Sequence, residues 1–285
     1  MQLCDLHVHS NYSDGTLTPA QIVREAQTLG LSAVALTDHN TVAGLPDFLR
    51  AAEGTSLKAV PGIEFSTDYL DVELHILGLF VQERHYDAIT RITDEMQQRK
   101  MQSNLDLIAA LNQAGYAVDY HKIKASMPAG EPNRALIAAE LTRLGYTPDI
   151  QSAFKTLLGA KCGYYHPPKR IDVFELIEFL RSIGAVPVLA HPFLNLKKPE
   201  ALREFLAPAR ECGLVGMEVL YSKFTPEQTG EAMSIADEFG LLYSGGSDFH
   251  GENKPDIRLG TGRGDLQIPL GYLEALQNHL SSKFL

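Results

Sequence analysis

The chain has 285 residues, of which 45% are hydrophobic and 21% charged, with 23 Gly, 15 Pro, 3 Cys and no Trp. This composition excludes collagen-like, intrinsically disordered and disulfide-stapled proteins. The 25 Lys and Arg against 35 Asp and Glu give a formal net charge of −10, which argues against broad binding to duplex nucleic acid or to an anionic membrane. The longest nearly apolar stretch, residues 74–81, is far shorter than the roughly 20 residues that span a bilayer. With no export signal at the N-terminus, a cytoplasmic location is expected.

Short β-rich runs alternate with segments of helical periodicity, which is typical of a parallel α/β fold. Seven runs are predicted as strands: residues 3–8, 33–37, 58–63, 73–81, 185–190, 215–220 and 241–245. Two of the intervening helices carry clear start signals, because Thr18 and Thr225 are each followed by Pro and, three residues on, by Gln. These helices are expected to end at Gly30 and Gly240.

The alternation stops between residues 94 and 168, where helical patterns cover residues 94–112, 132–144 and 148–158. We therefore expect a helical insertion, residues 94–168, between the fourth and fifth strands of a barrel domain made of residues 1–93 and 169–285. Residues 94–170 hold ten Lys or Arg and seven Asp or Glu, so this segment is +3 and the remainder −13. Such asymmetry suggests a basic lid that binds substrate over an acidic body, although most of these charges would equally suit solvated helix faces.

Histidines and carboxylates gather at or near the ends of the predicted strands. Strand alternation places Asp5, His7 and His9 on one face of the first strand. In closed parallel β/α barrels the loops that follow the C-terminal ends of the strands converge on a common cleft. The sequence therefore predicts a metal cluster whose nine ligands, too many for one ion, are His7, His9, Asp14, His39, Glu64, His75, His191, Asp248 and His250.

Two further carboxylates, Asp5 and Asp38, are expected to orient ligand imidazoles through their ring N–H groups, with ordinary strand-end hydrogen bonding as the alternative. A ligand set of carboxylates and imidazoles without thiolates favours two or three Mn²⁺, Fe²⁺ or Zn²⁺ ions over Mg²⁺. A water shared between two such ions would supply hydroxide near neutral pH. The candidate catalytic residues are Asp14, His191, Asp248 and His250; Asp248 or His250 could also move protons.

The ordered motifs resemble those of the PHP family, the polymerase and histidinol phosphatase domain. The matching segments are His7-Val8-His9, Ser13-Asp14-Gly15, Thr37-Asp38-His39, Gly62-Ile63-Glu64, His75, Ala190-His191-Pro192 and Gly246-Ser247-Asp248-Phe249-His250. The resemblance covers about residues 1–90 and 175–265. It implies a distorted seven-stranded β/α barrel similar to a TIM barrel, two or three divalent ions and phosphoesterase activity. One departure is Phe193, which replaces the glycine common after Pro192, so a different shape is expected for the adjoining loop.

The expected insertion also resembles that of bacterial PHP phosphoesterases acting on nucleoside 3′,5′-bisphosphates or trimming short RNA from its 5′ end. Arg134 and Lys161 are expected to hold a second phosphate, with an ordinary surface cation as the alternative for each. Tyr221 and Phe249 would stack on a base or merely pack their loops.

The favoured function is hydrolysis of the 3′-phosphate of nucleoside 3′,5′-bisphosphates by metal-activated hydroxide. Alternatives are 5′–3′ exoribonuclease activity on short 5′-phosphorylated RNA, histidinol-phosphate-type phosphatase activity, and a non-catalytic module stapled by its metals. The expected partner is a small nucleotide or short RNA, with no duplex nucleic acid and no membrane. The identity and number of the ions and the oligomeric state stay open.

Overall fold

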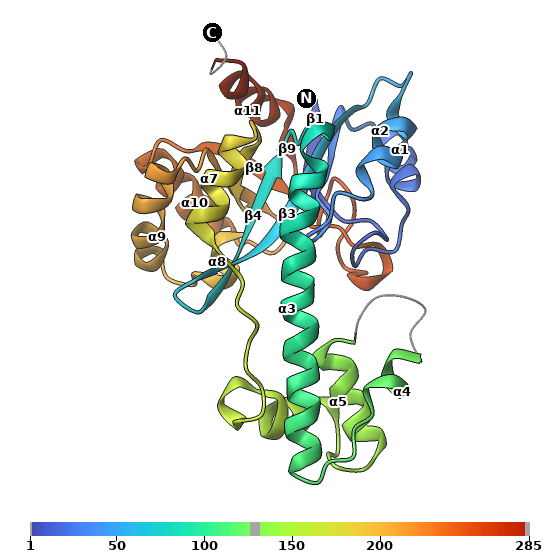
Figure 1. Cartoon of the computed structure of the whole chain (residues 1–285). Helices are drawn as coiled ribbons and strands as arrows, with labels where there is room; N and C mark the ends of the chain where they lie inside the picture. The colour runs from blue at the N-terminus through green and yellow to red at the C-terminus, as the bar shows by residue number, and fades with distance from the viewer. Residues whose placement is uncertain (1, 126–131, 283–285) are drawn as a thin grey trace. The chain divides into compact units, whose positions relative to one another are not determined.

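The computed structural model describes residues 2–125 and 132–282, and it divides into two compact units (Figure 1). The barrel unit comprises residues 1–91 and 171–285, and the helical unit comprises residues 92–170. No helix within the described ranges is long and apolar enough to cross a membrane.

Seven strands of the barrel unit form a nearly closed sheet in the order β8-β7-β6-β4-β3-β2-β1. They are β1 (Leu3–Val8), β2 (Ala33–Leu36), β3 (Lys58–Tyr69), β4 (Val72–Leu79), β6 (Val186–Leu189), β7 (Gly216–Tyr221) and β8 (Leu242–Gly246). Two-residue strands β5 (Ile171–Asp172) and β9 (Ile268–Pro269) pair with β3 and β1. The ring closes where the Asp248 N–H donates to the His7 carbonyl (2.9 Å) and the His9 N–H donates to the Phe249 carbonyl (3.0 Å). The predicted α/β barrel is thereby confirmed.

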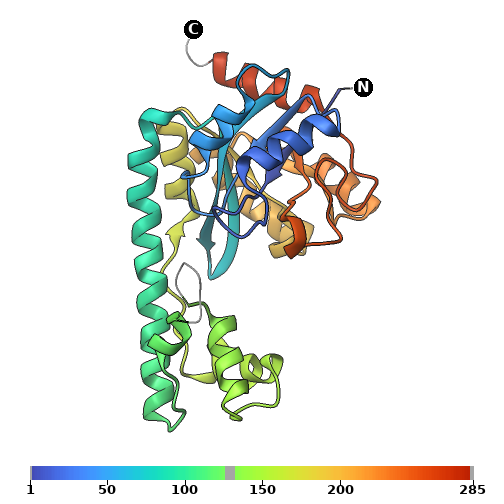
Figure 2. The ribbon, with the colours of Figure 1, turned by 90° about the vertical axis from the view of Figure 1, so that its right-hand side faces the viewer.

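The expectation of a parallel sheet is wrong at β4, which runs antiparallel to both β3 and β6. Strand β3 does not end at Ile63 but continues to Tyr69, and Leu70 and Asp71, both with positive φ, form a two-residue turn into β4 (Figure 2). So short a turn can join only antiparallel neighbours. Glu64 consequently lies within β3, and His75 lies in the middle of β4 rather than at a strand end.

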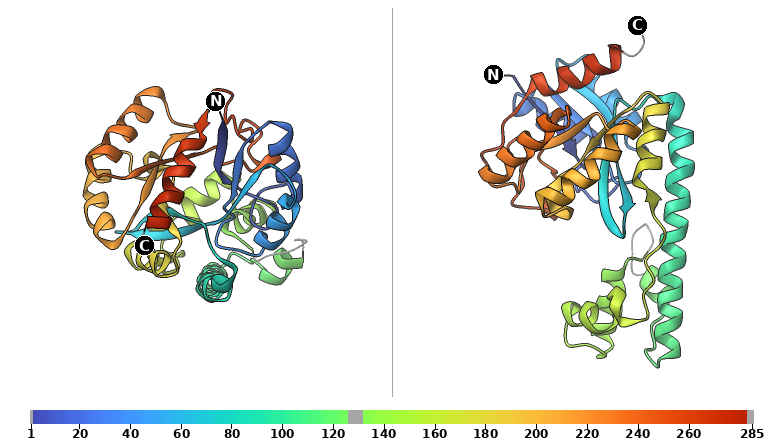
Figure 3. Two further views of the ribbon diagram at one scale, coloured as in Figure 1. Left: turned by 90° about the horizontal axis from the view of Figure 1, so that it is seen from above. Right: turned by 90° about the vertical axis from the view of Figure 1, so that its left-hand side faces the viewer.

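Helices surround this sheet, as the view from above shows (Figure 3, left). They are α1 (Pro19–Thr28), α2 (Leu45–Ala52), α7 (Val173–Ser182), α8 (Pro192–Asn195), α9 (Pro199–Cys212), α10 (Pro226–Glu238) and α11 (Leu270–Ser282). The predicted capping boxes at Thr18 and Thr225 are both present. Gly30 and Gly240 follow these helices with positive φ, the left-handed conformation that helix ends favour.

Between the strands and helices lies an apolar core. Its fully buried side chains include Leu6, Leu77, Val188 and Leu276, which come from β1, β4, β6 and α11. Because residues of distant sequence meet in this core, the strand order and the helix packing stabilise each other.

The helical unit has a core of its own. The long helix α3 (Tyr86–Gln113) begins in the barrel unit and continues into the helical unit, and it starts eight residues before the predicted segment. It is followed by α4 (Tyr120–Ala125), α5 (Arg134–Arg143) and α6 (Ile150–Ala153), then by a π-helical turn (Phe154–Leu158) and a 3₁₀ turn (Ala160–Cys162). Leu107, Leu111, Ile137, Leu141 and Leu158 are buried among them. The part of the unit that the structure describes is thus held together by helix packing.

The closure of the barrel predicts the effect of an added methyl group at Gly246. A Cβ there would lie 2.1 Å from the His7 Cβ and 2.8 Å from its backbone nitrogen, so β1 or β8 must shift. Overpacking of this kind should lower the free energy of unfolding of Gly246→Ala by about 3 kcal/mol, measured by urea denaturation. Gly230 lies inside α10, and a methyl group added there would meet nothing within 4 Å, so Gly230→Ala should instead stabilise by about 0.5–1 kcal/mol. Equal unfolding midpoints for the two variants would contradict the close approach of β8 to β1.

Candidate metal centre

Nine side chains converge at one edge of the barrel sheet. Four groups of them bring potential ligand atoms within 4.8 Å of one another, and neighbouring groups share members. Together the groups contain all the residues expected to ligate metal: His7, His9, Asp14, His39, Glu64, His75, His191, Asp248 and His250.

Glu64 lies at the centre of this cluster and is fully buried. It sits within β3, and the parallel bridge between His39 and Glu64 brings the segment after β2 alongside it. Its two carboxylate oxygens lie 2.8–3.2 Å from ring nitrogens of five histidines, namely His7, His9, His39, His75 and His191. A single carboxylate thereby links groups from five strands or the loops that follow them.

Many of the converging atoms lack hydrogen-bond partners. Within the described ranges, the buried cluster atoms with no partner are His7 Nε2, both ring nitrogens of His9, His39 Nδ1, Glu64 Oε2, His191 Nδ1 and His250 Nε2. Buried polar atoms are normally satisfied, so a group of orphaned lone pairs aimed at shared points requires an explanation. Divalent cations fit this donor set, because they need several nitrogen and oxygen ligands converging from different directions.

The loops after the strands hold two of these residues in strained backbone. Asp248 has φ +57° and His191 has φ +28°, in the region that residues other than glycine rarely adopt. Such strain persists only where surrounding contacts fix it, and it is common at functional sites. Asp14 lies on a turn beside the cluster, 57% exposed, with its Oδ1 3.2 Å from His250 Nε2. A methyl group on Gly15 would lie 2.4 Å from the His9 carbonyl oxygen, so that turn requires glycine.

The carboxylate that orients an imidazole is neither of the two expected. Glu218, fully buried in β7, accepts a hydrogen bond from His7 Nδ1 (2.9 Å) and another from the His191 N–H (2.6 Å). This bond leaves His7 Nε2 with its lone pair facing the cluster. Sequence reasoning missed Glu218, although an acidic residue inside the apolar run Met217-Glu218-Val219 was a usable signal.

The expected contact of Asp5 and Asp38 with imidazoles is corrected by the structure. Asp38 accepts hydrogen bonds from the Ser10 N–H (2.7 Å), the Ser10 hydroxyl (2.6 Å) and the Ser13 hydroxyl (2.6 Å). Asp5 accepts from the N–H groups of Ser247 (2.9 Å) and Gly260 (2.8 Å). Both carboxylates therefore fix loops next to the cluster, which is the strand-end hydrogen bonding that was the alternative expectation for them.

Charges within the cluster stabilise one another. Burial raises the pKa of Glu64, but the surrounding histidines outweigh it and hold the pKa well below its usual value. Burial lowers the pKa of His75, but Glu64 opposes this and raises it to about 10. His9 differs, since its burial dominates and lowers its pKa. The cluster thus favours ionised carboxylates, the form that binds cations.

A cavity of about 320 Å³ opens beside the cluster, lined among others by His39, His75, His191 and Asp248. Tyr221 also lines it, and its hydroxyl donates to Asp248 Oδ2 (2.7 Å). Phe249 does not line the cavity and is buried, in agreement with the packing alternative for that residue. Phe193, where the loop was expected to differ in shape, lies in the short helix α8. The centre of its ring lies 5.5 Å from that of Phe224.

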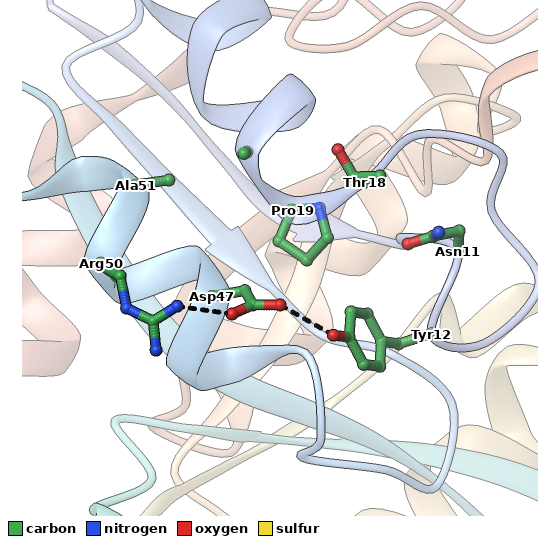
Figure 4. Close-up of a pocket in the computed structure, with 8 residues that line it drawn as sticks. Asn11, Tyr12, Thr18, Pro19, Asp47, Arg50 and Ala51 are labelled. Carbon is green, nitrogen blue, oxygen red and sulfur yellow. Dashed lines mark hydrogen bonds and ion pairs between the residues drawn. The ribbon is translucent and has the colours of Figure 1, made fainter.

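A second hollow of about 460 Å³ lies between α1 and α2 and contains none of the predicted ligands. In it the Tyr12 hydroxyl donates to Asp47 Oδ2 (2.8 Å), and Arg50 donates to the other oxygen of Asp47 (2.9 Å) (Figure 4). These polar groups are hydrogen-bonded to one another. The cavity beside the cluster, which is lined by predicted ligands, is therefore the candidate site of reaction.

The two expected phosphate contacts belong to the helical unit. Arg134 begins α5, and its guanidinium carbon lies 4.0 Å from the centre of the Tyr165 ring. Lys161 is exposed in the 3₁₀ turn before Gly163. Their contact with substrate stays a prediction.

Comparison with known proteins agrees with this geometry. A model of the PHP domain matches residues 5–165. A 5′-3′ exoribonuclease from Haemophilus influenzae is 30% identical over 86% of this chain and 89% of its own length. A phosphoribosyl 1,2-cyclic phosphate 1,2-diphosphodiesterase from Eggerthella lenta is 30% identical over 87% of this chain and 94% of its own. A 3′,5′-nucleoside bisphosphate phosphatase from Chromobacterium violaceum is 25% identical over 89% of this chain and 90% of its own.

Among solved structures, a metal-dependent phosphoesterase from Bifidobacterium adolescentis superposes with a TM-score of 0.75. It is 29% identical, and the match covers 97% of this chain and 96% of that one. The overall architecture is therefore shared along nearly the whole length of both chains.

The contacts of Glu218 predict a specific defect in metal binding. In Glu218→Gln an NH₂ group replaces one carboxylate oxygen and the negative charge is lost. The hydrogen bond from His7 Nδ1 is then weaker, or the NH₂ group donates to His7 Nδ1 instead. Mn²⁺ affinity, measured by titration calorimetry, should fall about 10–100-fold, as is usual when a group that orients a ligand is changed. Glu204→Gln, an exposed residue on α9, is the matched control and should bind Mn²⁺ like the wild type. Unchanged affinity in Glu218→Gln would show that Glu218 serves packing alone.

Proposed function

The chain belongs to the PHP family of metal-dependent phosphoesterases, and from that membership we propose that it removes the 3′-phosphate of nucleoside 3′,5′-bisphosphates. The observation that carries the proposal is the cluster of nine imidazole and carboxylate side chains beside an open cavity. Proteins use such clusters to bind phosphate esters through cations.

Two or three divalent ions are proposed, because the four overlapping groups contain more ligands than one ion accepts. Mn²⁺, Fe²⁺ and Zn²⁺ suit six imidazoles and three carboxylates, and the three cysteines lie outside the cluster. When bound, such ions act as Lewis acids on a phosphoryl oxygen and lower the pKa of water.

The chain's own groups then position the reactants. Hydrolysis forms one P–O bond from water, breaks the ester P–O bond, and delivers a proton to the departing 3′-oxygen. Asp14 and His250 lie together at the more open side of the cluster, and His250 Nδ1 faces the Asp248 carbonyl oxygen at 2.8 Å. We assign proton transfer to this pair in addition to ligation, and ligation alone to Asp248 and His191.

Two features support a nucleotide substrate. The relatives named above include a phosphatase of nucleoside bisphosphates and an exoribonuclease. A cavity of about 320 Å³ is at the small end of ligand sites, which suits one nucleotide better than a longer chain lying wholly inside. The net charge of −10 likewise disfavours duplex nucleic acid and anionic membranes as partners.

The second candidate is 5′–3′ exoribonuclease activity, favoured by the higher identity of the Haemophilus influenzae relative. It needs the same cations and cavity but attacks a diester. A histidinol-phosphate-type substrate has no second phosphate to hold. A non-catalytic role is disfavoured because none of the nine expected ligands is missing from the cluster.

Metal removal should destabilise the protein. A ligand bound only to the folded state adds about 2.7 kcal/mol at 100 times its Kd. Adding Mn²⁺ to chelator-treated protein should therefore raise the melting temperature, measured by differential scanning calorimetry. Asp14→Asn weakens one group of ligands and should reduce the rise. Identical melting curves with and without Mn²⁺ would contradict the proposed cluster.

The substrate itself can be tested with Mn²⁺-loaded protein. Phosphate release from adenosine 3′,5′-bisphosphate should be at least about 100-fold faster than from adenosine 5′-monophosphate, because only the former offers a 3′-ester and a second anchoring phosphate. Asp14→Ala and His250→Ala should abolish turnover while retaining the wild-type circular dichroism spectrum. Stepwise release of mononucleotides from a 5′-phosphorylated RNA hexamer, with little bisphosphate hydrolysis, would replace the leading proposal by the second candidate.

A further inference from the structure

Two lysines line the cavity beside the metal cluster, and neither belongs to the predicted site. Lys223 lies in the loop that follows β7, and Lys254 lies directly after the short 3₁₀ helix Gly251–Asn253, in the loop that follows β8. Both therefore come from the barrel unit, which also supplies the whole cluster.

Lys254 is held at the edge of the cluster by Asp248. Its ammonium nitrogen lies 2.8 Å from Asp248 Oδ2, while the other oxygen of Asp248 lies 3.3 Å from His9 Nε2 and 3.5 Å from His250 Nδ1. An ammonium group has three donors, so one bond to Asp248 leaves two for an anion. The Lys254 side chain is 29% exposed, so these donors are accessible from the cavity.

The loop that carries Lys254 is fixed to the turn that carries Asp14. The Asn253 side-chain amide donates to the Asp14 carbonyl (2.8 Å), and the Glu252 N–H donates to the Thr16 hydroxyl (3.0 Å). The two hydrogen bonds thus fix the loop of Lys254 and the turn of Asp14 relative to each other. A side chain that contacts phosphate needs such a fixed position.

Lys223 differs because its side chain is exposed, and within the described residues its charge acts on the carboxylate of Asp256, whose pKa it helps to lower. An exposed ammonium group on a cavity wall attracts an anionic ligand, with solvent and salt screening part of that attraction. Lys254 and Lys223 together give the cavity one positive charge held by Asp248 and one exposed positive charge.

We propose that these two lysines form a phosphate subsite of the barrel, in which Lys254 contacts the phosphoryl group being hydrolysed and Lys223 contacts a second phosphate of the same substrate. This inference rests on the proposed function. It places recognition of the second phosphate in the barrel, whereas the sequence-based expectation gave it to Arg134 and Lys161 of the helical unit. The required substrate chemistry is a small molecule with two phosphate groups.

Lys223→Met and Lys254→Met test the subsite, with Lys198→Met as a matched control. Lys198 is exposed at the start of α9 and does not line the cavity. Because a charged hydrogen bond contributes about 10- to 100-fold in affinity, Lys223→Met should raise KM for adenosine 3′,5′-bisphosphate at least about tenfold without changing kcat. KM for a substrate with one phosphate should stay unchanged in this variant.

Lys254→Met should instead lower kcat about 10–100-fold for every substrate, and it should raise the inhibition constant of inorganic phosphate by a similar factor. Its Mn²⁺ content, measured by mass spectrometry, should equal that of the wild type. Loss of Mn²⁺ in Lys254→Met would show that this lysine only positions Asp248 and would overturn its part of the proposal. Lys223→Met behaving like Lys198→Met would overturn the other part.

The phosphate subsite can still be tested if the proposed phosphatase activity is wrong. If the Mn²⁺-loaded wild type hydrolyses no nucleotide, calorimetric titration with inorganic phosphate still compares Lys254→Met with Lys198→Met. Titration with inorganic pyrophosphate does the same for Lys223→Met. Weaker binding in the cavity variants would retain the phosphate subsite, and equal binding would refute it.

Discussion

The barrel unit depends on the burial of one carboxylate, that of Glu64, among the ring nitrogens of five histidines. A buried charge is costly unless it is compensated, and here the compensation comes from several strands or the loops after them. Each of these must keep its register, because a slip of one residue would turn its side chain to the opposite face. Closure of the sheet between β1 and β8 brings His7 and Asp248 into the same cluster. The strand register that closes the barrel is therefore also the register that brings the histidines to Glu64.

The reversal of β4 is best understood from this constraint. A parallel fourth strand would need a long crossover after β3, and its last residue would reach the cluster. The two-residue turn instead sends the chain straight back, so the beginning of β4 lies at the edge where the parallel strands end. His75, paired with Ser66, can then approach Glu64 to 2.8 Å. The hairpin thus gives the cluster a potential ligand from within a strand.

Much of this could be predicted from sequence, because strand alternation and the capping boxes are local. Such patterns predict the His7-Val8-His9 motif, the helix starts at Thr18 and Thr225 and the convergence of the nine potential ligands. The direction of β4 could not be predicted, since Leu70 is not a usual residue for a turn position with positive φ and Asp71 alone is a weak signal. The role of Glu218 was equally hidden, because it depends on β6 and β7 lying side by side and on a hydrogen bond to a residue 211 positions away. Long-range partners decide such roles, and a single sequence does not state them.

The net negative charge of the chain is compatible with binding of a phosphate ester. The repulsion from the whole chain is long-ranged, whereas the attraction within the cavity is short-ranged. Repulsion between an overall charge of −10 and a polyanion is long-ranged and is screened beyond about 8 Å at physiological salt. Contacts inside the cavity are shorter than this, and Lys254 lies against Asp248 in partly buried surroundings where screening is weak. A small substrate can therefore bind to cations and lysines gathered in one cavity. A duplex is too large to enter the cavity, so it would lose that local attraction while the overall negative charge still repelled it.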